Sequence, residues 1–196
     1  MADVRPDGEI IRASLSDPDE FGEIYARHRR AVFRYVARRI GSQDAGDVTA
    51  DAFVRAFSIR TRYDASQTNS LPWLYGIARN IVGDRIRRTR RRKRTYIALV
   101  DQGDGEISDA DDRLVAYQVT RSLNSALRKL SSRDRETLLL FALEGLTYAE
   151  ISRVLDIPAG TVGSRITRAR RRILELIPDL EQISSTEGPA EHKDEQ

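Results

Sequence analysis

The residues best suited to chemistry are hydroxyl and guanidinium groups in a short segment near the C-terminus, AGTVGSRITRARRRI (159–173). At helical spacing, one side of this segment carries only apolar residues, Val162, Ile166, Ala169 and Ile173. The opposite side carries a polar set, Thr161, Ser164, Arg165, Arg168, Arg171 and Arg172. Arginine pairs bidentately with guanine in the major groove, and small hydroxyl groups contact bases or phosphates. The chemistry predicted for this helix is therefore the binding of DNA.

The residues just before this helix complete a helix-turn-helix pattern. Thr147 and Glu150 form a Thr-x-x-Glu capping box, in which each side chain satisfies a free backbone N–H of the other. The helix that they open would bury three apolar residues, Ile151, Val154 and Leu155. Asp156 follows, and aspartate tolerates the left-handed conformation of a tight turn. The alternative, an amphipathic helix whose polar face is merely solvated, does not explain the caps, the turn and the charge together.

Little else in the chain suggests catalysis. The sequence has no cysteine, which excludes a disulfide framework, a thiol nucleophile and a zinc-thiolate site. Its two histidines, His28 and His192, lie far apart, and His28 falls on an apolar stripe, so we expect it to pack in a core. No metal cluster, phosphate-binding loop or nucleophile–base set can be recognised. We therefore expect no enzymatic activity, no metal and no cofactor.

The elements that position these groups are predicted to be helices almost throughout, which gives an all-α fold with two helical domains. A helix expected over residues 19–40, ended by Gly41, would bury one stripe: Phe21, Ile24, Tyr25, His28, Val32, Tyr35, Val36 and Ile40. A second, over residues 44–59, would bury Val48, Ala52, Phe53, Ala56 and Phe57. A polar loop follows at residues 60–70, and a third helix begins near Pro72, where a missing N–H costs nothing.

The C-terminal part is predicted to begin with a helix over residues 113–129. The next helix, over residues 133–144, is capped by Ser131-Ser132 and stopped by Gly145. Its predicted core residues are Leu138, Leu139, Phe141, Ala142 and Leu143. The predicted organisation is a flexible N-terminus (1–15), a first domain (16–96), a flexible acidic linker (97–112), a second domain (113–178) and a polar tail (179–196).

Charge supports this division and indicates a polyanionic partner. Net charge is +12 over residues 21–100 and +4 over residues 113–183. Acidic segments flank these basic modules, at −4 over residues 1–20, −6 over residues 101–112 and −3 over residues 184–196. Residues 85–94 hold eight basic side chains in ten positions, which favours a phosphate-binding surface over a merely solvated run. No stretch has the length of a membrane span, and the N-terminus is not a signal peptide, so we expect a cytoplasmic protein without membrane insertion.

Three segments carry a resemblance to a known family. Residues 146–173, LTYAEISRVLDIPAGTVGSRITRARRRI, resemble the C-terminal DNA-reading domain of extracytoplasmic-function (ECF) sigma factors, within the sigma-70 family of bacterial transcription initiation factors. DAGDVTADAFVRAF (44–57) resembles the acidic helix with which this family clamps the coiled coil of the largest RNA polymerase subunit. SLPWLYGIARNIVGDRIRR (70–88) resembles the helix that melts the promoter and reads the −10 element. The resemblance covers roughly residues 15–178, departing from the family pattern at Ala50-Asp51, Ser152, Asp156 and Gly163.

The resemblance implies a factor that binds the RNA polymerase core, at the clamp of its largest subunit and at its flap region, and promoter DNA. An anti-sigma factor is a further implied partner. The implied polymerase contacts are Asp44, Asp47 and Asp51. The implied −10 contacts are Arg62, Tyr63, Asp64, Gln67, Asn69, Trp73, Asn80, Asp84, Arg87 and Arg88. The polar set on the C-terminal helix would read the −35 element.

Within the −10 set, the loop at residues 60–70 matches the family's pocket for a base flipped out of the non-template strand. Trp73 is open to two interpretations, a wedge against the opened duplex or a core residue. Two other functions also compete at this stage. A stand-alone regulator of the LuxR type shares the helix-turn-helix but has a sensor domain in place of a basic bundle. An arginine-rich RNA-binding protein would use residues 85–94.

Overall fold

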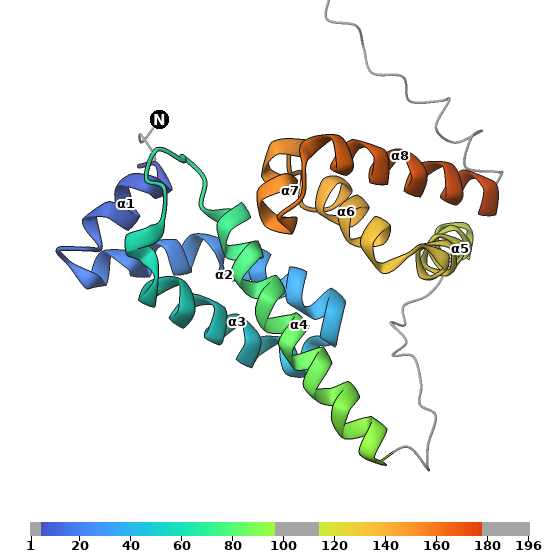
Figure 1. Cartoon of the computed structure of the whole chain (residues 1–196), viewed down its shortest axis with the longest axis horizontal. Coiled ribbons are helices and arrows are strands. Elements are labelled where there is room, and N and C mark those ends of the chain that lie inside the picture. Colours follow the sequence, from blue (N-terminus) through green and yellow to red (C-terminus); the bar gives the residue numbers. More distant parts are fainter. Residues whose placement is uncertain (1–4, 97–113, 178–196) are drawn as a thin grey trace, which may run out of the picture. The chain divides into compact units, whose positions relative to one another are not determined.

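The computed structural model describes residues 5–96 and 114–177 (Figure 1). Within these two ranges every regular element is a helix and none is a strand, which confirms the predicted all-α class. The helices form two units, α1–α4 and α5–α8. The predicted acidic linker (97–112) and polar tail (179–196) lie outside the described residues. None of the described helices is both long and apolar enough to cross a membrane.

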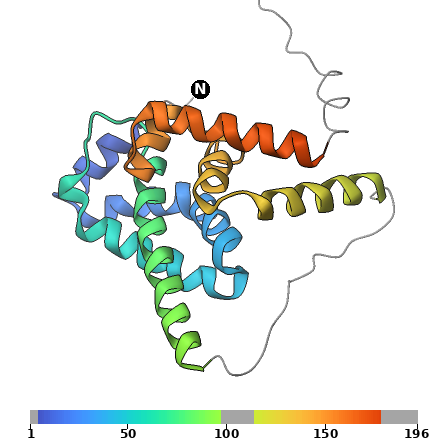
Figure 2. The ribbon, with the colours of Figure 1, turned by 45° about the vertical axis from the view of Figure 1, so that its right-hand side comes forward.

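The N-terminal unit is a bundle in which α2, α3 and α4 pack on one another and α1 packs on α2 (Figures 1 and 2). In chain order its elements are α1 (Asp7–Ala13), η1 (Pro18–Glu20), α2 (Phe21–Ile40), α3 (Ser42–Ser58), η2 (Arg60–Arg62) and α4 (Leu71–Tyr96). Gly41 ends α2 with a φ of 84°, as the sequence predicts. The Tyr35 and Tyr75 rings stack at the centre, 4.7 Å apart, among buried aliphatic side chains such as Ile24, Val36, Val48 and Leu74.

Part of the predicted flexible N-terminus (1–15) is an ordered helix, α1, over Asp7–Ala13. Ile10 and Ile11 are 0% and 2% exposed, so this short helix contributes two aliphatic side chains to the core. Burial of that much apolar surface stabilises a seven-residue helix that would be marginal in isolation. Helix α1 could not be predicted from the sequence, because its isoleucine pair lies in a short acidic segment that shows no helical period.

The apolar stripe predicted for α2 is only partly confirmed. Tyr25 was expected to face inward, yet it is 44% exposed. It lies at the edge of the α2 stripe, where its ring packs edge-on against Phe53 with centroids 5.0 Å apart. Five of the remaining positions are buried as predicted, whereas His28 and Ile40 are only half-buried; the buried ones are Phe21, Ile24, Val32, Tyr35 and Val36.

The C-terminal unit consists of α5 (Leu114–Lys129), α6 (Ser132–Ala142), α7 (Tyr148–Leu155) and α8 (Ala159–Leu176). Helix α8 packs against both α5 and α6. Ser131 caps α6 by accepting a hydrogen bond from the Asp134 N–H at 3.1 Å, close to the predicted start. Gly145 takes a φ of 66° after the end of α6, which is the left-handed conformation that glycine adopts without strain.

The predicted core face of α6 is partly wrong. Leu138 is buried as expected, but Leu140 is the fully buried leucine, whereas Ala142 is exposed and Leu143 is 56% exposed. The run LLLFAL (138–143) is apolar on every side of a helix. Periodicity therefore cannot choose a face, and packing against α8 decides which side is buried.

Candidate nucleic-acid interface

The helix-turn-helix begins with the predicted capping box. The Thr147 N–H donates to Glu150 Oε2 at 2.8 Å, and the Glu150 N–H donates to Thr147 Oγ1 at 3.3 Å. Each side chain thus satisfies a backbone donor of the other, which confirms the box. Ile151 is fully buried, and Leu155 is nearly so.

The turn between α7 and α8 is fixed by backbone contacts. Asp156 has a φ of 53°, the left-handed conformation predicted for it. The Ile157 N–H donates to the Ser152 carbonyl at 3.1 Å, and the Ser152 hydroxyl donates back to the Ile157 carbonyl. The Pro158 carbonyl then accepts from the Thr161 N–H at 2.8 Å. These contacts set the direction in which α8 leaves the turn.

Helix α8 presents the two faces that its sequence predicts. Val162, Ile166, Ala169 and Ile173 are at most 9% exposed and form the buried side. The predicted polar set lies on the other side, with Ser164, Arg168, Arg171 and Arg172 exposed and Thr161 and Arg165 half-buried. Arg170 was not predicted; it is exposed, and its guanidinium lies 5.2 Å from the Phe141 ring centroid.

Carboxylates hold three of the four predicted arginines of α8. Arg168 lies 3.3 Å from Asp134. Arg171 and Arg172 lie 3.9 Å and 2.8 Å from Glu175. Arg165 has no ion pair within the described part of the chain. Exposed ion pairs of this kind contribute at most about 1 kcal/mol, so a phosphate or a base edge can displace them.

The loop between η2 and α4 is shaped by its own polar side chains. Asp64 Oδ1 accepts from the Ser66 N–H at 3.0 Å and from the Ser66 hydroxyl at 2.7 Å, and Gln67 donates to Oδ2. These hydrogen bonds lower the pKa of Asp64. The Tyr63 hydroxyl donates to the Gln67 carbonyl at 3.2 Å. Asn69 is exposed, and its Oδ1 atom accepts from the Leu71 N–H at 3.0 Å.

Trp73 fits neither sequence interpretation fully. It is half-buried, and its ring lies 4.9 Å from the Tyr63 ring. Arg62, at the end of η2, is exposed. Further along α4, the predicted −10 residues Asn80, Asp84, Arg87 and Arg88 are all exposed, and Asp84 forms an ion pair with Arg87.

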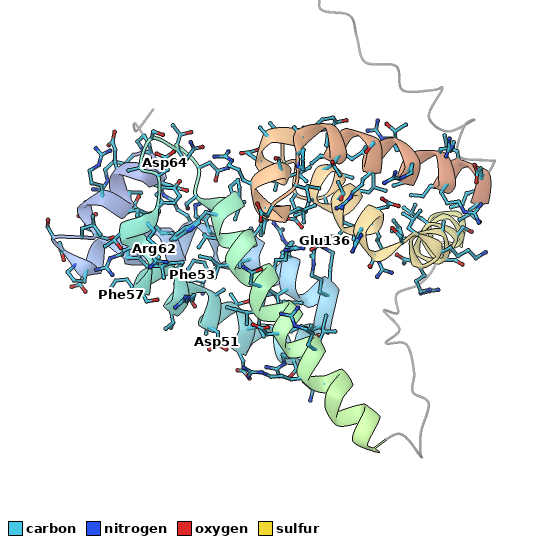
Figure 3. All side chains as sticks on the ribbon, in the orientation of Figure 1. Asp51, Phe53, Phe57, Arg62, Asp64 and Glu136 are labelled. Carbon is cyan, nitrogen blue, oxygen red and sulfur yellow. The ribbon has the colours of Figure 1, made fainter. Side chains whose placement is uncertain are left out.

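The three carboxylates predicted to contact polymerase from α3 differ in their surroundings. Asp47 and Asp51 are exposed, and Figure 3 labels Asp51 on α3 with Phe53 and Phe57 further along the same helix. Asp44 instead lies 2.6 Å from Arg85 of α4, so part of its charge is neutralised within the unit. Phe53 is 5% exposed, and Phe57 packs against Phe21 with ring centroids 5.4 Å apart, as predicted.

A groove of about 600 Å³ between α2 and α3 was not anticipated from the sequence. It is lined by Tyr25, Arg29, Arg30, Phe33, Arg34, Gly46, Thr49 and Ala50. Its lining residues Gly46 and Ala50 each stand one position before an exposed carboxylate of α3, Asp47 and Asp51. Its signal in the sequence is Phe33, an aromatic residue outside the predicted apolar stripe, among three arginines.

Comparison with known proteins finds two family matches. The family described as Sigma-70 region 2 matches residues 24–92, and the one described as Sigma-70, region 4 matches residues 120–173. The chain is 31% identical to the ECF RNA polymerase sigma factor BldN of Streptomyces coelicolor over 172 residues, which cover 87% of this chain and 65% of BldN. It is 34% identical to the ECF RNA polymerase sigma factor SigC of Mycobacterium tuberculosis over 143 residues, covering 73% and 75% of the two chains.

Two solved structures share the architecture. One is that of CnrH in complex with the cytosolic domain of CnrY, with a TM-score of 0.62 and 26% identity, covering 88% of this chain and 97% of that one. The other is that of the sigma factor RpoE in complex with the anti-sigma factor NepR from Bartonella quintana, with a TM-score of 0.61 and 22% identity, covering 82% and 98%. The second likeness concerns the fold alone.

Proposed function

The chain belongs to the ECF sigma factors of the sigma-70 family, and from this premise we propose how its residues share the work of promoter-specific transcription initiation. As a sigma factor it binds the RNA polymerase core and directs it to promoters. The observation that carries the assignment is the presence of both region 2 and region 4 in one chain. The region 2 match argues against a LuxR-type regulator, because it identifies the N-terminal unit as a sigma-factor domain rather than a sensor domain.

In the C-terminal unit, α8 enters the major groove of the −35 element. Arg165 and Arg168 are the principal base or backbone contacts, and Thr161 and Ser164 lie nearer the N-terminus of the helix. Arg171 and Arg172 contact phosphates, exchanging Glu175 for the DNA backbone. The buried face of α8 and the hydrogen-bonded turn before it support this arrangement because they fix the helix that carries all six side chains.

In the N-terminal unit, the loop from Arg62 to Asn69 receives a base flipped from the non-template −10 strand. Tyr63 and Trp73 supply ring surface, while Gln67 and Asn69 supply amide groups suited to a base edge. Asn80, Asp84, Arg87 and Arg88 continue the contact along α4. The half-buried position of Trp73 beside Tyr63 supports a role at the loop.

Helix α3 contacts the clamp of the largest polymerase subunit through Asp47 and Asp51. Asp44 contributes less because Arg85 already faces it at 2.6 Å. Region 4 meets the flap region in the same complex. The chain itself performs no chemistry, since the polymerase core supplies the catalysis, and it acts in the cytoplasm. The solved relative CnrH has a protein partner, the cytosolic domain of CnrY, and we expect an anti-sigma factor as a partner here.

The deciding experiment is in vitro transcription of genomic fragments by purified RNA polymerase core, with and without the chain. We expect defined start sites that appear only when the chain is present. Aligning the sequences upstream of those sites reveals the −10 and −35 elements. A core enzyme that neither retains the chain in a pull-down nor starts at new sites in its presence would refute the function.

A further inference from the structure

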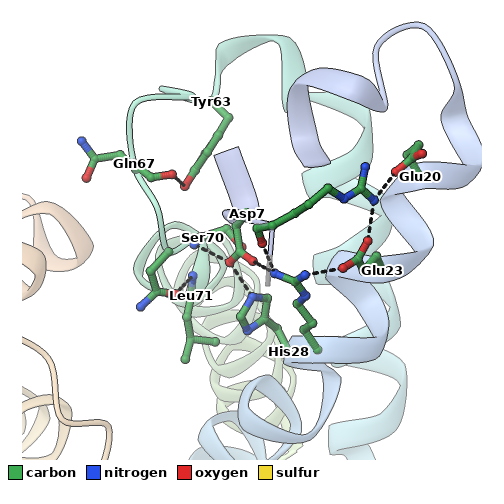
Figure 4. Close-up of polar contacts among 11 residues, drawn as sticks. Asp7, Glu20, Glu23, His28, Tyr63, Gln67, Ser70 and Leu71 are labelled. Carbon is green, nitrogen blue, oxygen red and sulfur yellow. Dashed lines mark hydrogen bonds and ion pairs between the residues drawn. The ribbon is translucent and has the colours of Figure 1, made fainter. Parts of the chain in front are cut away.

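Asp7 joins the first helix to the start of α4 (Figure 4). The residue is only 4% exposed. Its Oδ2 atom accepts hydrogen bonds from the backbone N–H and the hydroxyl of Ser70, both at 2.8 Å, and lies 2.6 Å from His28 Nε2. Its Oδ1 atom accepts from Arg27 Nη1 at 3.0 Å. One buried carboxylate therefore ties the loop end at Ser70 to two cationic or polar groups of α2.

The backbone of α1 also lies directly against the loop. The Asp7 N–H donates to the Thr68 carbonyl at 3.1 Å. A Cβ atom on Gly8 would lie 2.3 Å from the Ala65 carbonyl oxygen and 2.7 Å from that of Gln67. Those distances are far inside van der Waals contact, so only glycine fits between α1 and the loop.

Helix α2 holds the other side of this arrangement. Arg27 donates to the Arg5 carbonyl at 2.7 Å and pairs with Glu23 as well as with Asp7. Arg5 in turn lies 2.7 Å from both Glu20 and Glu23. Because α2 is part of the packed bundle, Asp7 is anchored to a rigid element rather than to another loop.

These contacts place one residue in particular. Asp7 binds Thr68 through its N–H and Ser70 through its carboxylate, so it grips the chain on both sides of Asn69. Asn69 is exposed, and its Oδ1 atom caps the Leu71 N–H. The hydrogen bonds that Asp64 forms with Ser66 and Gln67 lie at the surface, where water competes with them. In the described part of the loop, Ser70 is the one fully buried residue.

We propose that Asp7 is a positioning residue for −10 recognition: α1 acts as a strut that presets the loop at Tyr63–Asn69 for the flipped base. This inference rests on the proposed role of the loop. A loop fixed before binding loses less conformational entropy when the base arrives, which raises both affinity and selectivity. Asp7 does not touch DNA; it acts through Thr68 and Ser70.

The first test reports on the loop without DNA. Trp73 is the only tryptophan of the chain, and its ring contacts Tyr63, so its fluorescence senses the loop. Asp7→Asn puts an amide donor among the donors of Ser70, Arg27 and His28, which breaks at least one of these contacts. We expect acrylamide to quench Trp73 more strongly in this variant of the full chain. The matched control is Asp19→Asn, at an exposed aspartate of η1.

The second test measures reading of the base by the complex of chain and polymerase core. The probe is the non-template −10 strand of a promoter found by the transcription experiment, intact or abasic at one position in turn. For the wild type we expect one abasic position to weaken binding about tenfold, as removal of a stacked base does. Asp7→Asn should lose most of this preference while binding to core and to a −35 duplex is unchanged.

The outcomes separate the possible roles of Asp7. A purely structural role would weaken core binding, −35 binding and −10 binding together, and would overturn the inference. So would an Asp7→Asn chain with wild-type quenching and wild-type base preference. If that variant does not fold, Ser70→Ala removes one hydroxyl contact and is read out in the same two ways. A wild-type complex without any base preference refutes the pocket itself, and this inference with it.

Discussion

Asp7 is a carboxylate that must remain ionised to keep its contacts. Burial alone would raise its pKa, but hydrogen bonds from His28 and from the Ser70 N–H and hydroxyl outweigh burial and hold the pKa well below its ordinary value of 3.8. A pKa that is lower in the folded than in the unfolded state gives stability that is complete above the unfolded value. That stability disappears as the pH falls through the range below it.

We therefore expect Asp7→Asn to abolish part of the acid sensitivity of the N-terminal unit. The free energy of unfolding should differ most between wild type and variant above about pH 5, and the difference should narrow steadily as the pH falls from about 4 to about 2. Urea unfolding followed by Trp73 fluorescence at several pH values measures this difference. A gap that stays constant over that range would contradict the assigned ionisation of Asp7.

Among the α8 side chains, we expect substitution of Arg168 to reduce affinity for the −35 element most. Arg168→Ala should cost about 1–3 kcal/mol in −35 binding if the side chain pairs bidentately with guanine. Binding by the complex with core to matched promoter fragments, with and without the −35 guanines, measures the cost. Arg128→Ala, which removes an equal charge from α5, is the control. Unchanged transcription by the Arg168 variant would remove this residue from the interface.

Among the helices, α3 is predicted to carry the polymerase contact through its exposed carboxylates. Replacing Asp47 and Asp51 by lysine should abolish co-purification with core, because the charge facing a basic surface is reversed, while circular dichroism shows unchanged helicity. Asp44→Asn should have a smaller effect, since Asp44 is already paired with Arg85. Retention of core by the double lysine variant would show that α3 is not the contact.

Gly163 lies within α8 at a position where the backbone and the surrounding space do not require glycine. A Cβ atom on Gly163 would meet Tyr148 Cε2 at 3.5 Å, an ordinary contact, so Gly163→Ala should stabilise α8 by about 0.5–1 kcal/mol. Hydrogen exchange of the α8 amides in the full chain measures this gain as slower exchange. Gly145→Ala, after the end of α6, should instead destabilise the C-terminal unit, because φ is 66° there and a left-handed alanine costs about 1–2 kcal/mol. Faster exchange in the Gly163 variant would contradict the prediction.

The elements that were predictable from the sequence are those whose signals are local. The capping box at Thr147 and Glu150, the left-handed Asp156 and the α8 stripe all lie within a few positions of the groups they affect. Helix α1 was missed because it is too short to show a period, and its contact with the loop was missed because Asp7 and Ser70 are separated by 63 positions. The Asp44–Arg85 pair, 41 positions apart, escaped for the same reason, as did the groove between α2 and α3.

At the scale of the whole molecule, the charge distribution predicts dependence on polymerase. Two basic modules of +12 and +4 are separated by a segment of −6. This acidic segment repels the phosphates of DNA and competes with them for the arginine and lysine side chains of the modules. In the function proposed above, each module contacts DNA while the polymerase holds the two at a fixed spacing, which raises their effective concentration. Free protein should therefore bind promoter DNA far more weakly than the complex does. Equal affinity with and without core, measured by fluorescence anisotropy, would count against this.

The fit at Gly8 constrains how this sigma factor can change over time. Arg62 is exposed, so a substitution there leaves the packing of the loop against α1 intact and can change the base that the loop prefers. The partner position in α1 is not open to substitution, because even a methyl group there would push the loop aside. Substitutions that alter base preference are therefore compatible with this fold only while position 8 keeps the hydrogen atom of glycine as its side chain.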